Sequence, residues 1–150
     1  MGEDREDLLQ HHRQSRERLL SAIDGLSDEQ MSEPLLDGWS VKDHLAHLAL
    51  WDDIRAAEVE RISSGHVSAW RMTEEQDEAH NAAGYDLRRS MSVAQARWEL
   101  ETSRRKLLDA IAAANESALD PSRYGAAGLR SGHEGEHAGW IQRGRDEKGA

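Results

Sequence analysis

Apolar residues recur at spacings of three and four along several segments of the chain, separated by polar stretches that contain glycine or proline. This period places the apolar residues on one face of an α-helix. The predicted helices cover residues 4–24, 40–64, 92–115 and, more briefly, 133–146. A further short helix is predicted over 73–84, and no segment alternates apolar and polar residues as a half-buried strand does. The pattern therefore predicts an all-α four-helix bundle that forms a single domain over residues 1–150.

Two of these helices begin with clear capping signals. Ser40 is a typical N-cap residue, and Asp43 three residues later can complete a capping-box-like pair with it. Thr73 is a comparable N-cap for the short helix, which Gly84 is expected to end.

The composition narrows the possible functions. The 150 residues include 19 Lys and Arg against 29 Asp and Glu, which gives a net charge of −10. Nucleic-acid affinity depends largely on cationic side chains, so nonspecific binding of nucleic acid is disfavoured, as is an anionic membrane surface. No segment approaches the roughly 20 apolar residues of a membrane span. The absence of cysteine excludes disulfides, thiolate metal sites and a cysteine nucleophile. We therefore expect a cytoplasmic protein with neither a nucleic-acid nor a membrane partner.

The strongest chemical signal is a histidine pair at the start of the last helix. His133 and His137 are four residues apart, so both imidazoles lie on the same side of the helix and can reach one point. A third imidazole from another helix would complete a facial set of ligands with open positions, as in catalytic metal sites. His47 is the best candidate because it lies in the middle of an apolar helix face, and His44 one turn earlier is the alternative.

Two other interpretations of this segment are open. The chain has eight histidines, so a pair at this spacing can arise by chance and a buried histidine can simply be a hydrogen-bonded core residue. The segment also spells the H-E-x-x-H motif of zinc proteases, with Glu134 as general base. Gly135 weakens that helix and few residues follow His137, which disfavours a protease. Glu134 can nevertheless face a water on the metal.

The aromatic composition suggests a pocket beside these histidines. The chain has five tryptophans and no phenylalanine. Trp51 and Trp140 fall on the histidine-bearing helix faces, so with His44 they can form the wall of a substrate pocket. The alternative for each tryptophan is that it fills the core and donates its N–H to a nearby acceptor.

Two segments of the chain resemble the DinB-like superfamily, and most closely its ClbS/DfsB-type branch. They are residues 38–51 (GWSVKDHLAHLALW) and 132–141 (GHEGEHAGWI), and residues 77–82 (DEAHNA) echo the same branch. The resemblance implies an up-up-down-down four-helix bundle, often a homodimer, with a metal held by three histidines. These positions fall here on His47, His133 and His137. Related proteins often have an aromatic residue where this chain has Glu134, which bears on the shape of the pocket.

Three functions are compatible with such a site. The resemblance implies a metal-dependent thiol S-transferase, in which a divalent ion (zinc, nickel, iron or copper) would hold a low-molecular-weight thiol as thiolate for attack on an electrophilic or xenobiotic small molecule. A self-resistance hydrolase would instead use metal-activated water, with Glu134 or Glu136 as proton acceptor, on a reactive natural product. A non-enzymatic protein that sequesters a small hydrophobic ligand is the third.

Overall fold

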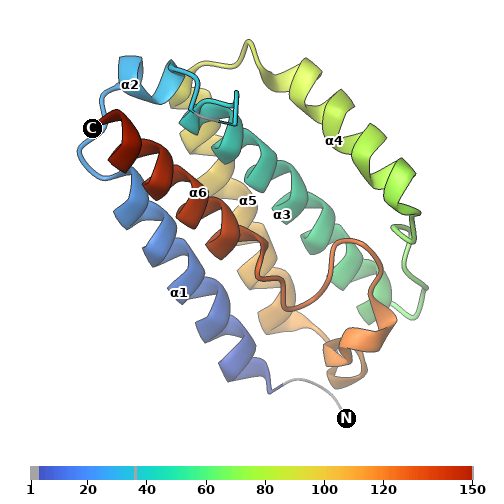
Figure 1. Cartoon of the computed structure of the whole chain (residues 1–150). Helices are drawn as coiled ribbons and strands as arrows, with labels where there is room; N and C mark the ends of the chain where they lie inside the picture. The colour runs from blue at the N-terminus through green and yellow to red at the C-terminus, as the bar shows by residue number, and fades with distance from the viewer. Residues whose placement is uncertain (1–3, 36, 150) are drawn as a thin grey trace.

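The computed structural model describes residues 4–35 and 37–149, and this part of the chain is almost entirely helical (Figure 1). The α-helices are α1 (Arg5–Ile23), α2 (Asp28–Ser32), α3 (Val41–Ser63), α4 (Glu74–Arg88), α5 (Val93–Ala113) and α6 (His133–Lys148), with short 3₁₀ helices at Glu116–Leu119 and Pro121–Arg123. The described residues form no β-strand, and a single isolated bridge joins Pro34 and Ser40. The all-α prediction is confirmed.

The four longest bundle helices form two parallel pairs. Helix α1 runs beside α6 in the same direction, α3 runs beside α5 in the same direction, and the two pairs are antiparallel to each other (Figure 1). The order is thus up-down-down-up, so the up-up-down-down order implied by the resemblance is wrong. The long connection after α3 contains α4, which carries the chain back along the bundle before α5 begins. Hydrogen bonds show that residue numbers rise together within each pair. They join His11 to Ser131 and Ala22 to Arg145 for α1 and α6, and Asp52 to Arg104 and Ser63 to Asn115 for α3 and α5.

The predicted caps are present, but one predicted helix end is wrong. Ser40 accepts from the Asp43 N–H while the Asp43 carboxylate accepts from the Ser40 N–H, which completes a capping box at the start of α3. Helix α4 does not end at Gly84 and continues to Arg88. A Cβ at Gly84 would lie 2.8 Å from Leu50 Cδ2, so glycine here permits close packing of α4 on α3.

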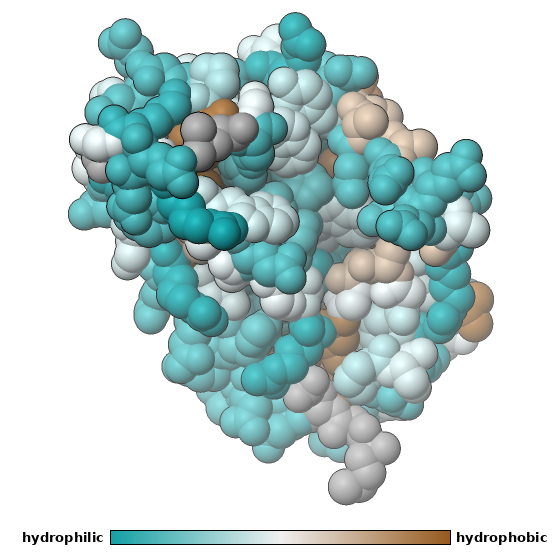
Figure 2. Space-filling view, in the orientation of Figure 1, coloured by the Kyte–Doolittle hydropathy of each residue, from teal (hydrophilic) through white to brown (hydrophobic). Residues whose placement is uncertain are grey.

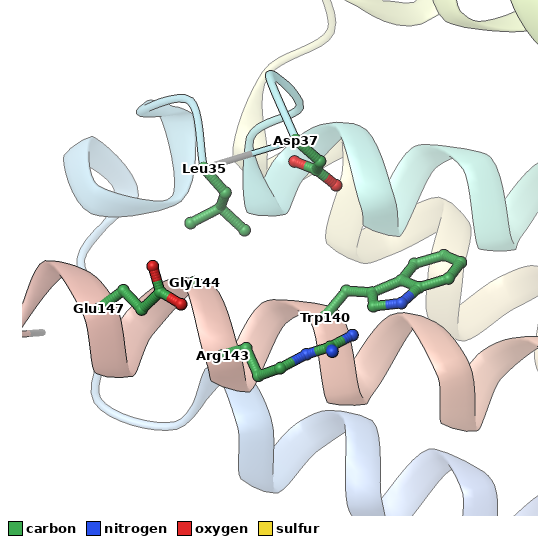
Figure 3. A pocket seen from close by; sticks show the side chains of 6 residues that line it. All are labelled: Leu35, Asp37, Trp140, Arg143, Gly144 and Glu147. Carbon is green, nitrogen blue, oxygen red and sulfur yellow. The ribbon is translucent and has the colours of Figure 1, made fainter.

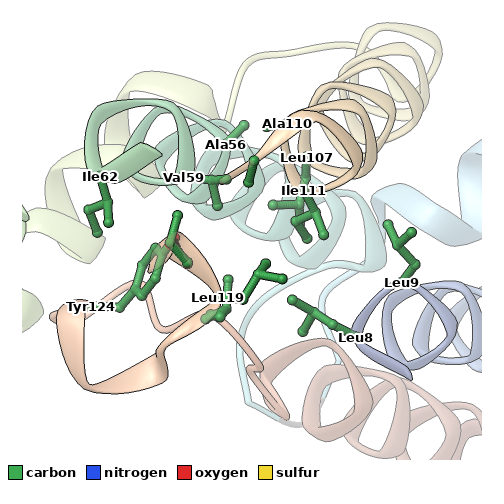
Figure 4. Close-up of a cluster of buried hydrophobic side chains, with 13 residues drawn as sticks. Leu8, Leu9, Ala56, Val59, Ile62, Leu107, Ala110, Ile111, Leu119 and Tyr124 are labelled. Atoms are coloured by element: carbon green, nitrogen blue, oxygen red, sulfur yellow. Dashed lines mark hydrogen bonds between the residues drawn. The ribbon is translucent and has the colours of Figure 1, made fainter. Parts of the chain in front are cut away.

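Buried apolar residues in the described part of the chain form three clusters, and the two larger ones lie at opposite ends of the bundle. One, drawn in Figure 4, gathers side chains from the start of α1 and the ends of α3 and α5. The other gathers the end of α1, the starts of α3 and α5, and the middle of α6. Buried polar side chains lie between them, at the middle of the helices. None of the helices in the described ranges is long and apolar enough to cross a membrane.

The face of the molecule shown in Figure 2 is largely hydrophilic, with apolar side chains in small separate patches. Large apolar side chains with substantial exposure are Leu20, Val67, Leu87, Trp98 and Trp140. The homodimer stays a prediction.

Candidate metal centre

Three histidines from two helices converge at one point inside the bundle. His47 lies in the second turn of α3, and His133 and His137 lie in the first two turns of α6, which runs antiparallel to α3. His133 Nε2 lies 3.1 Å from His47 Nε2 and 3.0 Å from His137 Nε2. All three ligand atoms lie within 4.8 Å of one another, so these histidines could hold a metal ion.

The two short distances from His133 Nε2 match the demands of a cation better than those of a hydrogen-bonded group. A neutral imidazole nitrogen offers either one N–H or one lone pair. His133 Nε2 can therefore complete only one of its two contacts as an ordinary hydrogen bond. Metal–nitrogen bonds of about 2.0–2.1 Å at angles of 90–109° would place ligand nitrogens roughly 2.9–3.4 Å apart. The residues present thus fit a divalent ion, which would accept a lone pair from each ring.

The protein environment keeps these rings in the form that binds metals. Burial, reinforced by the neighbouring imidazoles, lowers the pKa of His137 to about 2 and that of His47 to about 3. Burial, with a smaller contribution from the Arg55 guanidinium, also lowers the pKa of His133. All three rings are therefore neutral at pH 7, and neutral imidazole is the ligand form of histidine.

The segment that leads into α6 is anchored by two histidines of α1. The His11 ring donates to Ser131 O at 2.8 Å, and the His12 ring donates to Leu129 O at 3.1 Å. These bonds fix the start of α6, and with it His133 and His137, against the first helix.

His44, the alternative third ligand, lies behind the three converging nitrogens. It is 1 % exposed, and its Nδ1 lies 2.7 Å from His137 Nδ1, the ring nitrogen of His137 that faces away from the other two histidines. Asp37 Oδ2 lies 2.9 Å from His44 Nε2 as an ion-pair contact, although the angle is not that of a regular hydrogen bond. We use "histidine cluster" for the four residues His44, His47, His133 and His137.

The two tryptophans predicted to form a pocket lie in different surroundings. The Trp140 ring is 4.6 Å from the His137 ring and lines a half-open cavity of about 390 Å³ (Figure 3). The side chains and backbone that line it belong to Leu35, Asp37, Trp140, Arg143, Gly144 and Glu147. Trp51 is instead buried in a second aromatic group, against the rings of Trp70 and His80, and donates its indole N–H to Asn81 Oδ1.

Glu134 is engaged by arginines. Its carboxylate is 4 % exposed, and its Oε1 accepts hydrogen bonds from Arg16 Nη2 and Arg104 Nη2, both at 3.0 Å. These two ion pairs engage one carboxylate oxygen, whereas Oε2 has no hydrogen-bond partner among the described residues. The role of proton acceptor for Glu134 stays a prediction.

The same arginines belong to a buried layer of charge that the sequence analysis missed. Asp52 in the middle of α3 accepts from three guanidinium groups that come from three different helices. The layer, which we call the charged layer, consists of Arg16, Asp52, Arg55, Arg104 and Glu134. The sequence signal was an aspartate on the buried face of an otherwise apolar helix, with an arginine three residues later.

Comparison with known proteins places this arrangement in a family. A sequence model of the DinB superfamily matches residues 11–141. The chain belongs to the DinB superfamily. The crystal structure of an uncharacterised protein from Escherichia coli UTI89 has a similar fold, with a TM-score of 0.81 at 15 % sequence identity, over 97 % of this chain and 94 % of that chain. No curated protein sequence matches the chain significantly. The fold, the superfamily and the histidine cluster are thus established, and the reaction has to be argued from the site itself.

Proposed function

We propose that this DinB superfamily protein is a metal-dependent enzyme that transfers a small thiol to an electrophilic molecule. The observation that carries the proposal is the convergence of three neutral imidazoles from two helices. His133 Nε2 lies 3.1 Å from His47 Nε2 and 3.0 Å from His137 Nε2, and all three ligand atoms lie within 4.8 Å of one another. His47, His133 and His137 would hold one divalent ion and leave further coordination positions for a thiol and substrate. A divalent ion in such a site favours the deprotonated form of a thiol or water that it binds.

The thiol has to come from outside the chain, because the protein has no cysteine. In the proposed reaction the thiolate sulfur forms a bond to an electrophilic carbon. The bond from that carbon to the leaving group, or one bond of a strained ring or double bond, breaks at the same time. The electron pair of the broken bond stays on the leaving group, or on the substrate atom released by ring opening or addition. The thiol proton ends on that atom or on the solvent, so no oxidant or reductant is needed. The proposed transfer does not require Glu134, one oxygen of which is paired with Arg16 and Arg104, as a proton acceptor.

The cavity at Trp140 is the proposed site of the small-molecule substrate. It adjoins the histidine cluster through the contact between the Trp140 and His137 rings. Its volume of about 390 Å³ is within the range of sites that bind small organic molecules. An indole that is 41 % exposed gives an apolar wall, while Arg143, Asp37 and Glu147 supply charged groups at its edge. This set suits a flat or partly apolar molecule with a polar end.

The test is a turnover assay with the purified protein loaded with Zn²⁺, Ni²⁺ or Fe²⁺, a monothiol and a chromogenic electrophile. We expect a thioether product whose formation requires both the metal and the thiol, and which is lost in His133→Ala. His66→Ala, at an exposed histidine, is the matched control and should retain the activity. Product that forms with metal but without thiol would instead indicate a hydrolase. Retention of the electrophile without any product would indicate a sequestering protein.

A further inference from the structure

Three side chains contact one another in turn between the candidate metal centre and the surface of the protein: His137, His44 and Asp37. His137 presents Nε2 to the other two ligands and Nδ1 to His44, at 2.7 Å. His44 in turn presents Nε2 to the Asp37 carboxylate, at 2.9 Å. His44 and His137 are buried, whereas the Asp37 side chain is 45 % exposed and points toward the cavity of Trp140 (Figure 3).

When a metal is bound, only one combination of tautomers of His137 and His44 fits these contacts. A metal bound at His137 Nε2 would take the lone pair of that nitrogen, so the proton of the neutral ring would be on Nδ1. That N–H faces His44 Nδ1, which must then be the acceptor. The proton of His44 is therefore on Nε2, where it faces the Asp37 carboxylate. The His137–His44 pair is thus a donor facing an acceptor, and the Asp37 carboxylate lies in ion-pair contact with the His44 nitrogen that carries the proton.

Both members of the outer pair are held in place by their surroundings. The Trp39 ring packs edge-on against the His44 ring, with 5.4 Å between the ring centres. The backbone N–H of His44 donates to Ser40 O in the first turn of α3. Asp37 lies in a tight turn that a Leu35 N–H to Trp39 O bond closes. Its Oδ1 accepts from the Trp39 N–H at 3.1 Å, which leaves Oδ2 to face His44. The carboxylate thus has one oxygen for the turn and one for the histidine.

We propose that His44 and Asp37 are positioning residues, which fix the tautomer and orientation of His137 so that its Nε2 lone pair points at the metal. The inference rests on the proposed metal site. It adds to that site the contacts from Asp37 through His44 to His137, which we call the relay. Partners of this kind, which hold the outer nitrogen of a ligating histidine, commonly change metal affinity by 10- to 100-fold when they are removed.

The first test measures the dissociation constant of Zn²⁺ by competition with a chelator, in the full-length protein. His44→Leu should weaken binding by about 10- to 100-fold, because the His137 N–H loses its acceptor. His44→Gln should recover part of the loss, since an amide can both accept and donate, and Asp37→Asn should weaken binding less than His44→Leu does. His66→Leu is the control: it removes an exposed histidine that lies outside the relay and outside the bonds that anchor α6, and it should bind Zn²⁺ with nearly the affinity of the wild type.

The outcomes separate the relay from the site itself. If His44→Leu binds Zn²⁺ within twofold of the wild type, or if His66→Leu loses as much as His44→Leu, the relay is wrong while the metal site stands. If the wild type binds no divalent metal, both the site and the relay are wrong.

The second test needs no variant and therefore does not depend on the folding of His44→Leu. Two-bond ¹H–¹⁵N correlation spectra of the Zn²⁺ form distinguish the two tautomers of each imidazole. We expect His137 protonated on Nδ1 and His44 protonated on Nε2. A His44 ring with its proton on Nδ1, or a His137 ring bound to metal through Nδ1, would overturn the relay.

Discussion

The bundle contains two buried polar groups, the charged layer and the histidine cluster, which differ in how their atoms are paired. In the charged layer donors face acceptors: Arg104 alone donates to Asp52, to Glu134 and to the backbone carbonyl of His12. In the histidine cluster like atoms face one another, with three Nε2 atoms directed at a shared point. A cavity of about 10 Å³, roughly the size of one water molecule, is lined by both His133 and Glu134 where the two groups meet.

The difference indicates which group is paired internally. Buried charges are tolerated when they are paired, and both carboxylates of the charged layer form ion pairs with arginines, although Glu134 Oε2 has no hydrogen-bond partner among the described residues. These ion pairs join α1, α3, α5 and α6. Three converging imidazole nitrogens cannot all pair with one another by hydrogen bonds, whereas a cation can accept a lone pair from each of them. The charged layer therefore positions the helices, and the histidine cluster is the buried polar group whose nitrogens are complementary to a bound metal ion.

The largest expected effect comes from breaking the charged layer. Asp52→Ala leaves the Arg16, Arg55 and Arg104 guanidinium groups with one buried carboxylate between them, so the free energy of unfolding should fall by about 3–5 kcal/mol. Urea denaturation measures the loss. Glu101→Gln, which removes an ion pair between two largely exposed side chains, is the control and should change stability by less than about 0.5 kcal/mol. A similar loss in both variants would contradict the distinction.

The second prediction addresses the histidine cluster through its ligand. Zn²⁺ at about 1,000 times its dissociation constant should stabilise the wild type by about 4 kcal/mol, because the metal binds the folded chain. Thermal unfolding with and without Zn²⁺ measures this shift. The same addition should leave the melting temperature of His47→Ala nearly unchanged, and an equal shift in both proteins would indicate that the metal binds elsewhere.

A smaller effect is expected from pH in the metal-free protein. Burial, with the nearby Arg104, lowers the pKa of His12 from 6.5 to about 3. Below about pH 6.5 the unfolded chain takes up a proton that the folded chain does not, so the free energy of unfolding should fall as the pH falls from 6.5 toward 3. Each such histidine contributes up to about 1.4 kcal/mol per pH unit in this window. Urea titrations in EDTA at pH 7, 6 and 5 measure the slope, which should be shallower in His12→Gln. Constant stability over this range would contradict the burial of neutral rings.

The helices were predictable because their signals are local. Ser40 and Asp43 cap α3 within one turn, and the apolar spacing needs no knowledge of the partner helix. The end of α4 was not predictable in the same way. Gly84 has the chemistry of a helix stop, but its close contact with Leu50 of α3 depends on tertiary packing. The direction of α5 was not predictable from local signals either. It depends on α4, which is not one of the four bundle helices and carries the chain back along the bundle before α5 begins.

The candidate site was predictable only in part. The spacing of His133 and His137 alone predicts that they share a helix face, and the place of His47 on an apolar helix face made it the best third candidate. The proximity of the three rings was therefore predictable from the sequence. The orientation of His44 toward His137 could not be derived, because it depends on the antiparallel register of α3 and α6. The engagement of Glu134 by Arg16 and Arg104 was also missed, since its partners come from two helices remote in sequence.

The most direct test of the central claim is the metal content of the purified protein. After incubation with a divalent metal and removal of the excess, elemental analysis should find one equivalent per chain in the wild type and in the exposed-histidine control His66→Ala. His137→Ala should retain none, because it removes the ring at which the three-histidine set and the His44–Asp37 relay meet. A full equivalent of metal in His137→Ala, or none in the wild type, would contradict the account.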